Sequence, residues 1–239
     1  KEWFNILAGT GTYQLDIKQN SRQRDLITNQ VACSPTCTPN NNNFGKTNGY
    51  IYTNLNFNQN INATAGFSYD SYKELGLNID KFNPKFGLQW DIANNLRLRL
   101  AWMETVKTPL TTNQTIEPTQ IAGFNQLFAD RNGTQSRRVG IGLDTHYKRN
   151  VFSGFEISSR NLKVALYGLL SNSVDFENQK ENLYRIYLYG LLHNNWSAKS
   201  ELLYEKFSRD KTFDGPHQID TLSIPTGIHY FDPRGFFAN

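Results

Sequence analysis

Apolar and polar side chains alternate along most of this chain. In the segment WDIANNLRLRLAW, residues 90–102, Leu96, Leu98 and Leu100 alternate with Arg97 and Arg99. Successive side chains of a β-strand point to opposite faces, so the leucines share one face and the arginines share the other. The pattern predicts strands that have one apolar face and one hydrated face.

The same alternation recurs from one end of the chain to the other. We predict ten strands, and the segment GFFAN begins an eleventh, so we expect the sheet to be incomplete at this end. The apolar positions that define the other strands are Tyr13, Leu15 and Ile17; Ile51, Thr53, Leu55 and Phe57; Ile61, Ala63, Ala65, Phe67 and Tyr69; Phe86, Leu88, Trp90 and Ile92; Val139, Ile141, Leu143 and Tyr147; Val151, Phe155 and Ile157; Tyr184, Ile186, Leu188 and Leu192; Trp196, Ala198, Leu202 and Tyr204; and Leu222, Ile224, Ile228 and Tyr230.

The connections between the predicted strands alternate in length. Short turns rich in Asn, Asp, Gly and Pro, which tight hairpins favour, fall at 58–60, 93–95, 149–150, 194–195 and 232–235. Long polar loops are predicted between them, at 18–48, 72–82, 106–134, 160–180 and 208–217. Outer-membrane barrels have short periplasmic turns and longer extracellular loops, whereas a soluble sandwich has no reason to keep this order.

The fold class predicted from these patterns is all-β. We expect an antiparallel up-and-down transmembrane β-barrel of about 12 or more strands, because single-chain bacterial barrels hold an even number of strands. Residues 1–239 form a single outer-membrane barrel domain in this interpretation. The apolar faces then meet lipid, and the polar faces line a wet lumen. The predicted lumen-lining residues are Arg97, Arg99, Arg138, Asp144, Glu156, Arg160, Arg185, Lys199, Glu201 and Glu205.

Composition supports strands that cross a membrane. Aromatic residues make up 13% of the chain, with 16 Phe and 12 Tyr, and aromatic side chains suit pleated surfaces. No apolar run approaches the roughly 18 residues of a transmembrane helix. Several aromatics fall near predicted strand ends, as expected for the girdles at the two membrane surfaces. These are Phe57, Trp90, Trp102, Tyr147, Trp196 and Tyr230.

The net charge of +4 is spread along the chain without a basic block, which argues against a nucleic-acid partner. Cys33 and Cys37 lie close together in a loop rich in Pro and Asn, so we predict a local disulfide in an oxidising compartment.

Pro225 lies within an apolar strand and cannot donate a ladder hydrogen bond, so it predicts a bulge or an irregularity.

The loop TIEPTQIAGFNQLFADRNGT has Ile121, Phe124, Leu127 and Phe128 at helical spacing, which predicts a short amphipathic helix. We expect this loop to pack its own small core. The alternative is a constriction or ligand-binding element that folds toward the lumen.

Catalytic chemistry has no clear signature. His146, His193, His217 and His229 lack the spacing of metal ligands, so we predict neither a metal nor a cofactor. Glu201 and Glu205 share a strand face and could imitate an acid/base pair, although charged lumen residues commonly pair with basic neighbours. The glycines of GTGTY and GIGLD have no helical pattern after them, which excludes a phosphate loop. We expect no enzymatic activity.

Several segments resemble a known family. FNPKFGLQWDIANNLRLRLAWMETVKTPL resembles the barrel hairpins of TonB-dependent outer-membrane receptors. IEPTQIAGFNQLFADRNGTQSRRVGIGLD, GFEISSRNLKV, LYEKFSRD and LSIPTGIHYFDPRGFFA resemble, more closely, the C-terminal barrel of outer-membrane proteins that carry tetratricopeptide repeats. The resemblance covers about residues 80–239 and implies a bacterial outer-membrane location. It implies no catalytic residue, and neither a plug nor a repeat region is recognisable in the chain.

Three function hypotheses follow. The leading one is a porin-like polar channel that transports hydrophilic solute or polymer across the outer membrane, with arginines that favour anionic or sugar-like cargo. The second is a plugged barrel that serves as a structural, partner-binding component of an envelope complex. The third is a soluble carbohydrate-binding sandwich. The expected partners are membrane lipid and other envelope proteins, such as a periplasmic repeat domain or a plug.

Overall fold

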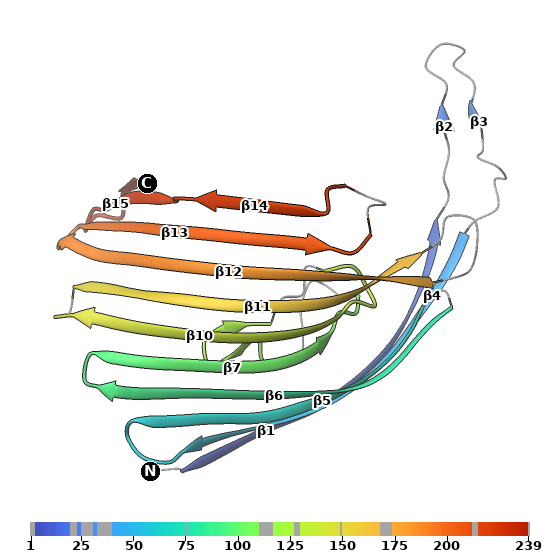
Figure 1. The fold of residues 1–239 in the computed structure, drawn as a ribbon, viewed down its shortest axis with the longest axis horizontal. Coiled ribbons are helices and arrows are strands. Elements are labelled where there is room, and N and C mark those ends of the chain that lie inside the picture. The colour runs from blue at the N-terminus through green and yellow to red at the C-terminus, as the bar shows by residue number, and fades with distance from the viewer. Residues whose placement is uncertain are drawn as a thin grey trace.

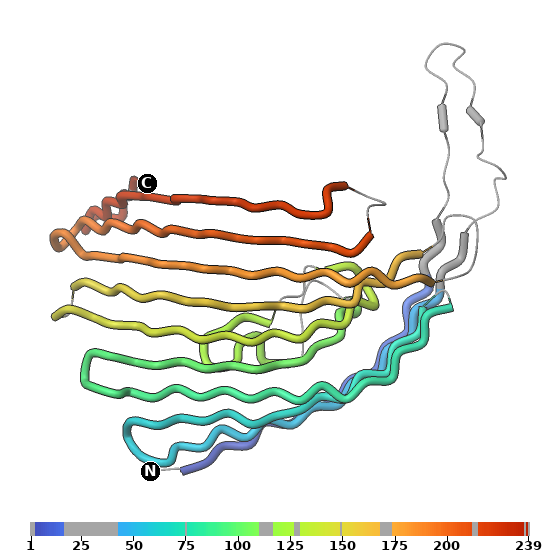
Figure 2. Tube along the Cα trace, in the orientation of Figure 1, coloured from blue at the N-terminus to red at the C-terminus, as the bar shows by residue number. Residues whose placement is uncertain are grey.

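The computed structural model contains one long antiparallel sheet. It describes residues 3–19, 23–24, 31–32, 40–74, 76–109, 117–126, 130–148, 150–167, 174–211 and 215–238. The sheet holds twelve strands, and neighbours in the sheet follow the chain order apart from two small two-stranded sheets. Figure 1 and Figure 2 show the strands side by side, with both chain termini at the end where the turns are short.

In the described part of the chain, eight strands of the large sheet are longer than the roughly 9–11 residues with which a tilted strand crosses a bilayer. The twelve strands of this sheet are β1 (Phe4–Gln19), β4 (Asn40–Asn56), β5 (Ile61–Glu74), β6 (Leu77–Ala93), β7 (Leu96–Val106), β10 (Gln135–Tyr147), β11 (Val151–Tyr167), β12 (Val174–His193), β13 (Trp196–Arg209), β14 (Gln218–Ser223), β15 (Thr226–Phe231) and β16 (Phe237–Ala238). The small sheets are β2 (Gln23–Arg24) with β3 (Val31–Ala32), and β8 (Gln120–Ile121) with β9 (Phe124–Asn125). If β14 and β15 count as one interrupted strand, ten strands and the start of an eleventh lie along the sheet, as predicted.

The all-β, antiparallel barrel class predicted from the sequence is confirmed, and the chain forms part of such a barrel. In the described part of the chain, no helix is both long and apolar enough to cross a membrane. The predicted short turns all lie at one end of the sheet. The prediction of a long loop at 72–82 is wrong, because Glu74 pairs with Leu77 across a tight turn that contains Gly76 at φ +83°. Much of the predicted loop 160–180 is also strand, since β11 and β12 pair as far as Tyr167 and Val174.

The convex face of the sheet is apolar, with aromatic side chains toward both ends. Near the short turns, Trp196 packs against Tyr230 with 4.8 Å between ring centroids. Nearer the long connections, Phe86 stacks on Trp102, and other convex aromatic pairs are Phe67 with Phe82 and Tyr184 with Tyr204. Tyr204 lies eight positions after Trp196 in extended β13, which is about 26 Å along the strand and roughly 20 Å along the membrane normal after tilt. This spacing matches an outer-membrane barrel, whose apolar band lies between two aromatic girdles.

Pro225 interrupts the last long strand without shifting its register. Leu203 pairs with Ser223 in β14, and Ser200 pairs with Thr226 in β15, so the same pairing offset holds on both sides of the interruption. The N–H of Glu201 still donates to the carbonyl oxygen of Pro225, at 3.0 Å. The predicted irregularity is therefore a missing proline N–H rather than a bulge.

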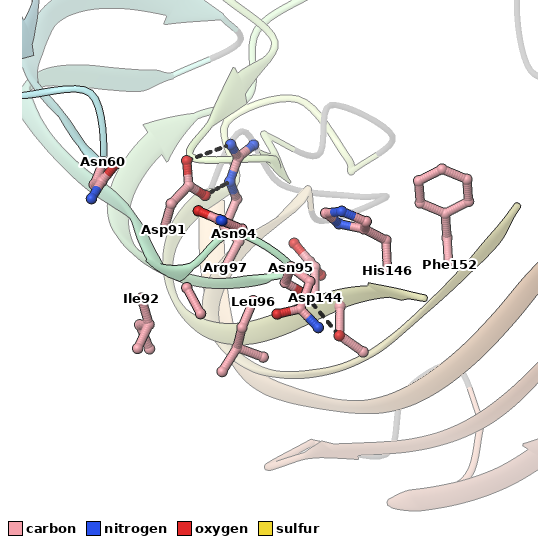
Figure 3. Close-up of a pocket in the computed structure, with 12 residues that line it drawn as sticks. Asn60, Asp91, Ile92, Asn94, Asn95, Leu96, Arg97, Asp144, His146 and Phe152 are labelled. Atoms are coloured by element: carbon pink, nitrogen blue, oxygen red, sulfur yellow. Dashed lines mark hydrogen bonds and ion pairs between the residues drawn. The ribbon is translucent and has the colours of Figure 1, made fainter. Parts of the chain in front are cut away.

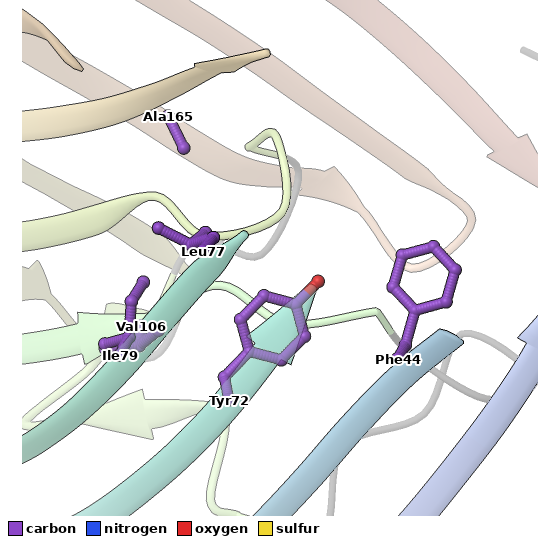
Figure 4. Packing of buried hydrophobic residues seen from close by; sticks show 6 residues of the cluster. All are labelled: Phe44, Tyr72, Leu77, Ile79, Val106 and Ala165. Carbon is purple, nitrogen blue, oxygen red and sulfur yellow. The ribbon is translucent and has the colours of Figure 1, made fainter. Parts of the chain in front are cut away.

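A buried apolar cluster lies at the end of the sheet where the connections are long. It contains Phe44, Tyr72, Leu77, Ile79, Val106 and Ala165 (Figure 4). The Tyr167 hydroxyl of β11 donates to Glu74 Oε2 of β5 at 2.8 Å, and the Tyr72 hydroxyl donates to the same oxygen. These contacts join the tips of strands that are separated in the sheet order by β6, β7 and β10.

Candidate functional site: the concave wall and the hairpin that covers it

The strand registers place all ten predicted lumen-lining residues on one face of the sheet. For example, Arg97 faces Asp144 across β7 and β10, and Glu156 faces Arg185 across β11 and β12. In Figure 3 the side chains of Asp91 and Arg97 lie inside the curve of the sheet, whereas Ile92 and Leu96 lie outside it. The ten residues therefore belong to the concave face: Arg97, Arg99, Arg138, Asp144, Glu156, Arg160, Arg185, Lys199, Glu201 and Glu205.

The arginines of this face are paired with carboxylates of the same chain. Arg99 Nε lies 2.5 Å from Asp144 Oδ2, and Arg185 Nε lies 2.8 Å from Glu201 Oε2. Arg138 Nη2 lies 3.5 Å from Glu156 Oε1. The further pairs are Arg97 with Asp91, Arg99 with Glu156, and Arg160 with both Asp130 and Glu181. Because most of the positive charge is neutralised locally, the wall offers much less attraction to anions than the arginines alone suggest.

A polar hollow of about 640 Å³ lies at the short-turn end of the concave face (Figure 3). Its lining includes Asp91, Arg97, His146 and Phe152. Among the described residues, no group of three or more His, Cys, Asp or Glu side chains could hold a metal ion. Glu201 accepts hydrogen bonds from Arg185 and from the Tyr189 hydroxyl, which makes it a charge-paired wall residue.

The connection between β7 and β10 crosses this concave face as a hairpin. The prediction of a helix is wrong for Ile121 and Phe124, because β8 and β9 pair Ile121 with Phe124 around Ala122 and Gly123. Both turn residues have positive φ, at 47° and 82°, which is the requirement of a tight type I′ turn. Turn chemistry and packing on the wall thus outweigh the helical spacing. Leu127 and Phe128 lie outside the described residues.

A row of small side chains on the wall receives the hairpin. Gly87, Ala101, Gly140 and Ser158 face one another on β6, β7, β10 and β11. A Cβ atom at Gly87 would come within 2.7 Å of Ile121, and one at Gly140 within 2.4 Å of the Phe124 ring. Ile121 and Phe124 are each only 1% exposed. The loop therefore packs against the barrel wall instead of forming its own core, which confirms the alternative that it folds toward the inside.

Phe124 also makes polar contacts through its ring. The Arg99 guanidinium lies 4.9 Å from the ring centroid, and the Arg138 guanidinium lies 5.9 Å from it. Arg138 Nη1 donates to the backbone oxygen of Asn125 at 2.8 Å. Cation–π contacts of this kind contribute on the order of 0.5–2 kcal/mol each, depending on desolvation. Two wall arginines that bind carboxylates of the strands therefore also hold the hairpin.

The start of the hairpin segment is anchored by a buried charge pair. Glu117 Oε2 lies 2.7 Å from Nζ of Lys85, a wall residue that is 1% exposed. Tyr52 donates its hydroxyl to Glu117 at 2.8 Å, and Asn48 donates its amide at 3.0 Å. Burial raises the pKa of Glu117, but the Lys85 charge and these hydrogen bonds outweigh it, so the pKa of the carboxyl lies below its ordinary value. The carboxylate is therefore charged when the hairpin is docked.

Several residues of this site were not identified from the sequence. Lys85 lies one residue before the apolar position Phe86, so the alternation indicates only that its side chain faces water, whereas Glu117 and Tyr52 carried no signal of their own. Gly87 and Gly140 did carry one, because a glycine inside a strand often marks the close approach of another segment. Their register, which needs the strand pairing, is what aligns them with Ala101 in one row.

Together, the apolar convex face, the aromatic girdles and the charged concave wall define an outer-membrane β-barrel. Residues 2–136 match the family model of the TonB-dependent receptor-like β-barrel. The chain therefore belongs to the TonB-dependent receptor-like β-barrel family, and its location is the bacterial outer membrane. No curated protein matches the chain in sequence.

Solved structures of transporters and receptors share this fold. The copper transporter OprC is 12% identical with a TM-score of 0.64, and the match covers 97% of this chain and 40% of OprC. The FrpB iron transporter from Neisseria meningitidis is 15% identical with a TM-score of 0.62, covering 100% of this chain and 44% of FrpB. The ferric-catecholate import receptor Fiu from E. coli is 10% identical with a TM-score of 0.59, covering 95% of this chain and 39% of Fiu. The chain thus spans about two-fifths of the length of these structures.

Proposed function

We propose that this chain forms part of the wall of an outer-membrane transporter, and that residues 117–126 narrow its lumen. The solute is hydrophilic, because the wall that it passes is polar and charged. OprC is a copper transporter, FrpB is an iron transporter, and Fiu is a ferric-catecholate import receptor. A metal ion or a metal chelate is the class of solute that this similarity favours for our chain.

The observation that carries the proposal is that the wall is shaped to receive the hairpin. We call this receiving surface, formed by Gly87, Ala101, Gly140, Ser158 and Lys85, the dock. A loop that only covers a barrel mouth needs neither a row of small wall residues nor a buried lysine aimed at its carboxylate. Here both are present, since Gly87 and Gly140 make room for Ile121 and Phe124, and Lys85 binds Glu117. Burial of an ion pair costs desolvation free energy that close packing and hydrogen bonds must offset. The wall and the hairpin are therefore adapted to each other.

The test measures outer-membrane permeability with the hairpin docked and undocked. The full-length protein is expressed in a Gram-negative host, either unchanged or with Phe124→Ala and Glu117→Gln together. Sensitivity to a hydrophilic antibiotic too large for general pores is then compared at equal amounts of folded protein. We expect the double variant to sensitise the cells. Thr10→Ala and Thr12→Ala, changed together on the exposed β1, provide the control and should leave sensitivity unchanged.

Unchanged sensitivity in the double variant would contradict the constriction. It would favour the second hypothesis from the sequence, a plugged barrel that binds a partner in an envelope complex, which predicts co-purification of another chain.

We also propose that this chain belongs with the barrels that are linked to tetratricopeptide repeats. The segments that carry this resemblance are 116–144, 154–164, 203–210 and 222–238. The sequence of the full-length protein around this chain tests that proposal, since a repeat region would support it and a plug with a TonB box would contradict it.

A further inference from the structure

A row of hydrogen-bond donors crosses the convex face just beyond the apolar band. Arg137 of β10 pairs in register with Asn161 of β11, Asn161 pairs with Lys180 of β12, and Lys180 pairs with Ser208 of β13. Two lysines flank this row: Lys163 is two residues from Asn161, and Lys206 is two residues from Ser208 on the same face. We call Arg137, Asn161, Lys163, Lys180 and Lys206 the outer basic patch.

The outer basic patch lies on the membrane side of the wall, not inside the barrel. Val139, two residues from Arg137, is 49% exposed among the apolar convex side chains, and Tyr184, four residues from Lys180, belongs to the aromatic girdle. At a rise of about 3.3 Å per residue, tilted strands carry the patch roughly 5–10 Å beyond the apolar band. This is the depth of the polar headgroups, which add about 5–8 Å on each side of the hydrocarbon.

The charges of the outer basic patch are only partly compensated by acidic neighbours. Asp220 of β14 pairs in register with Lys206 on the same face. Glu104 is the acidic neighbour of Arg137 in the row, and its carboxylate is shared between Arg137 Nε at 2.8 Å and Lys81 Nζ at 3.1 Å. The side chain of Arg137 is nevertheless 59% exposed. Lys163 lies 4.3 Å from the Phe176 ring centroid, a contact that leaves its charge unneutralised.

We propose that the outer basic patch binds the phosphate of a lipid headgroup in the outer leaflet. Adjacent strands are about 4.8 Å apart, so the long side chains of Arg137 and Lys180 can converge on one phosphate above Asn161 between them. Arg, Lys and Asn supply donors, and phosphate oxygens only accept. The long connections of such barrels face the cell exterior, which assigns the patch to the outer leaflet. The acyl chains of the same lipid would lie along the apolar face directly below.

The test compares lipids that differ only in phosphate. The full-length protein is placed in phosphatidylcholine nanodiscs that contain phosphorylated lipid A or its dephosphorylated form, and bound lipid is counted by native mass spectrometry. We expect the phosphorylated form to be retained, and Lys180→Glu to lower its bound fraction at least about fivefold, from the attraction of one basic side chain near a charged surface. Lys73→Glu is the matched control, because Lys73 is an exposed lysine on the convex face of β5, away from the outer basic patch.

Three results would overturn the proposal. The first is equal retention of dephosphorylated lipid, which would show that the acyl chains alone bind. The second is displacement of the lipid by inorganic phosphate, which would assign the patch to a free anion. The third is an equal effect of the β5 control. Heat-modifiable migration on gels checks folding of each variant, and Arg137→Gln replaces Lys180→Glu if the latter does not fold.

Discussion

Because the hairpin packs on a row of small wall residues, we predict that one side chain added to this row releases the hairpin. At Gly140, a Cβ would lie 2.4 Å from the Phe124 ring, against the 3.5–4.0 Å of an ordinary carbon contact. Gly140→Val therefore forces the ring to retreat by more than about 1 Å. Overpacking of this kind costs about 1–3 kcal/mol, which raises the undocked population about 5- to 150-fold. Valine also favours strands, so β10 itself should not lose stability.

Amide hydrogen exchange of the full-length protein measures this change. Peptides that cover residues 117–126 should exchange about 5- to 150-fold faster in Gly140→Val, because exchange reports local opening. Gly49→Val provides the control, since a Cβ at Gly49 meets no atom within 4 Å. Exchange in the rest of β10 should stay slow in both variants. If Gly140→Val folds and its hairpin exchanges as slowly as in the unchanged protein, the hairpin is not held by the small-residue row.

Three further predictions concern single groups. Glu117 has a lowered pKa in the docked state, so its contribution is complete above the ordinary value of 4.5 and is lost as the pH falls through the lowered value. Hairpin exchange, corrected for intrinsic rates, should therefore rise only below that pH, whereas Glu117→Gln should exchange faster at neutral pH and lack the acid step. Pro225→Val restores the N–H opposite Glu201 and should raise the free energy of unfolding by about 0.5–1.5 kcal/mol, measured by denaturant titration in detergent, and an unchanged or lower value would contradict this account. Cys33 and Cys37, which lie outside the described residues, should resist alkylation until a reductant is added, and immediate alkylation would contradict the predicted disulfide.

The sequence predicted the barrel well because period-two alternation depends only on which solvent each face meets. Leu96 to Trp102 and their arginine neighbours needed no knowledge of the partner strand. Strand ends were harder to predict, since Asp80, Asn83 and Lys163 are polar and resemble loop residues, yet β6 and β11 continue through them. Beyond the bilayer both faces of a strand are hydrated, so the alternation that marks a membrane span fades there.

The hairpin was harder to predict for a different reason. Ile121 and Phe124 have a spacing that suits a helix as well as a two-residue hairpin, and only the wall decides between them. The dock depends on Gly87, Ala101 and Gly140 coming into one row, and register across three strands cannot be read from the spacing of residues along the chain. The charges were predicted as lumen residues individually, but their pairing across strands was not.

The length of β12 has a consequence for how the protein meets the outside of the cell. Its 20 residues extend about 66 Å, or roughly 45–50 Å along the membrane normal at usual barrel tilts. An apolar band about 25 Å tall leaves roughly 20 Å of strand beyond the hydrocarbon, of which about 5–8 Å on each side lies among the headgroups. An antibody or a phage therefore meets a folded collar of paired strands in addition to the connections between them. The epitopes of this collar are made of residues from neighbouring strands, so sera raised against the denatured chain should recognise the collar poorly.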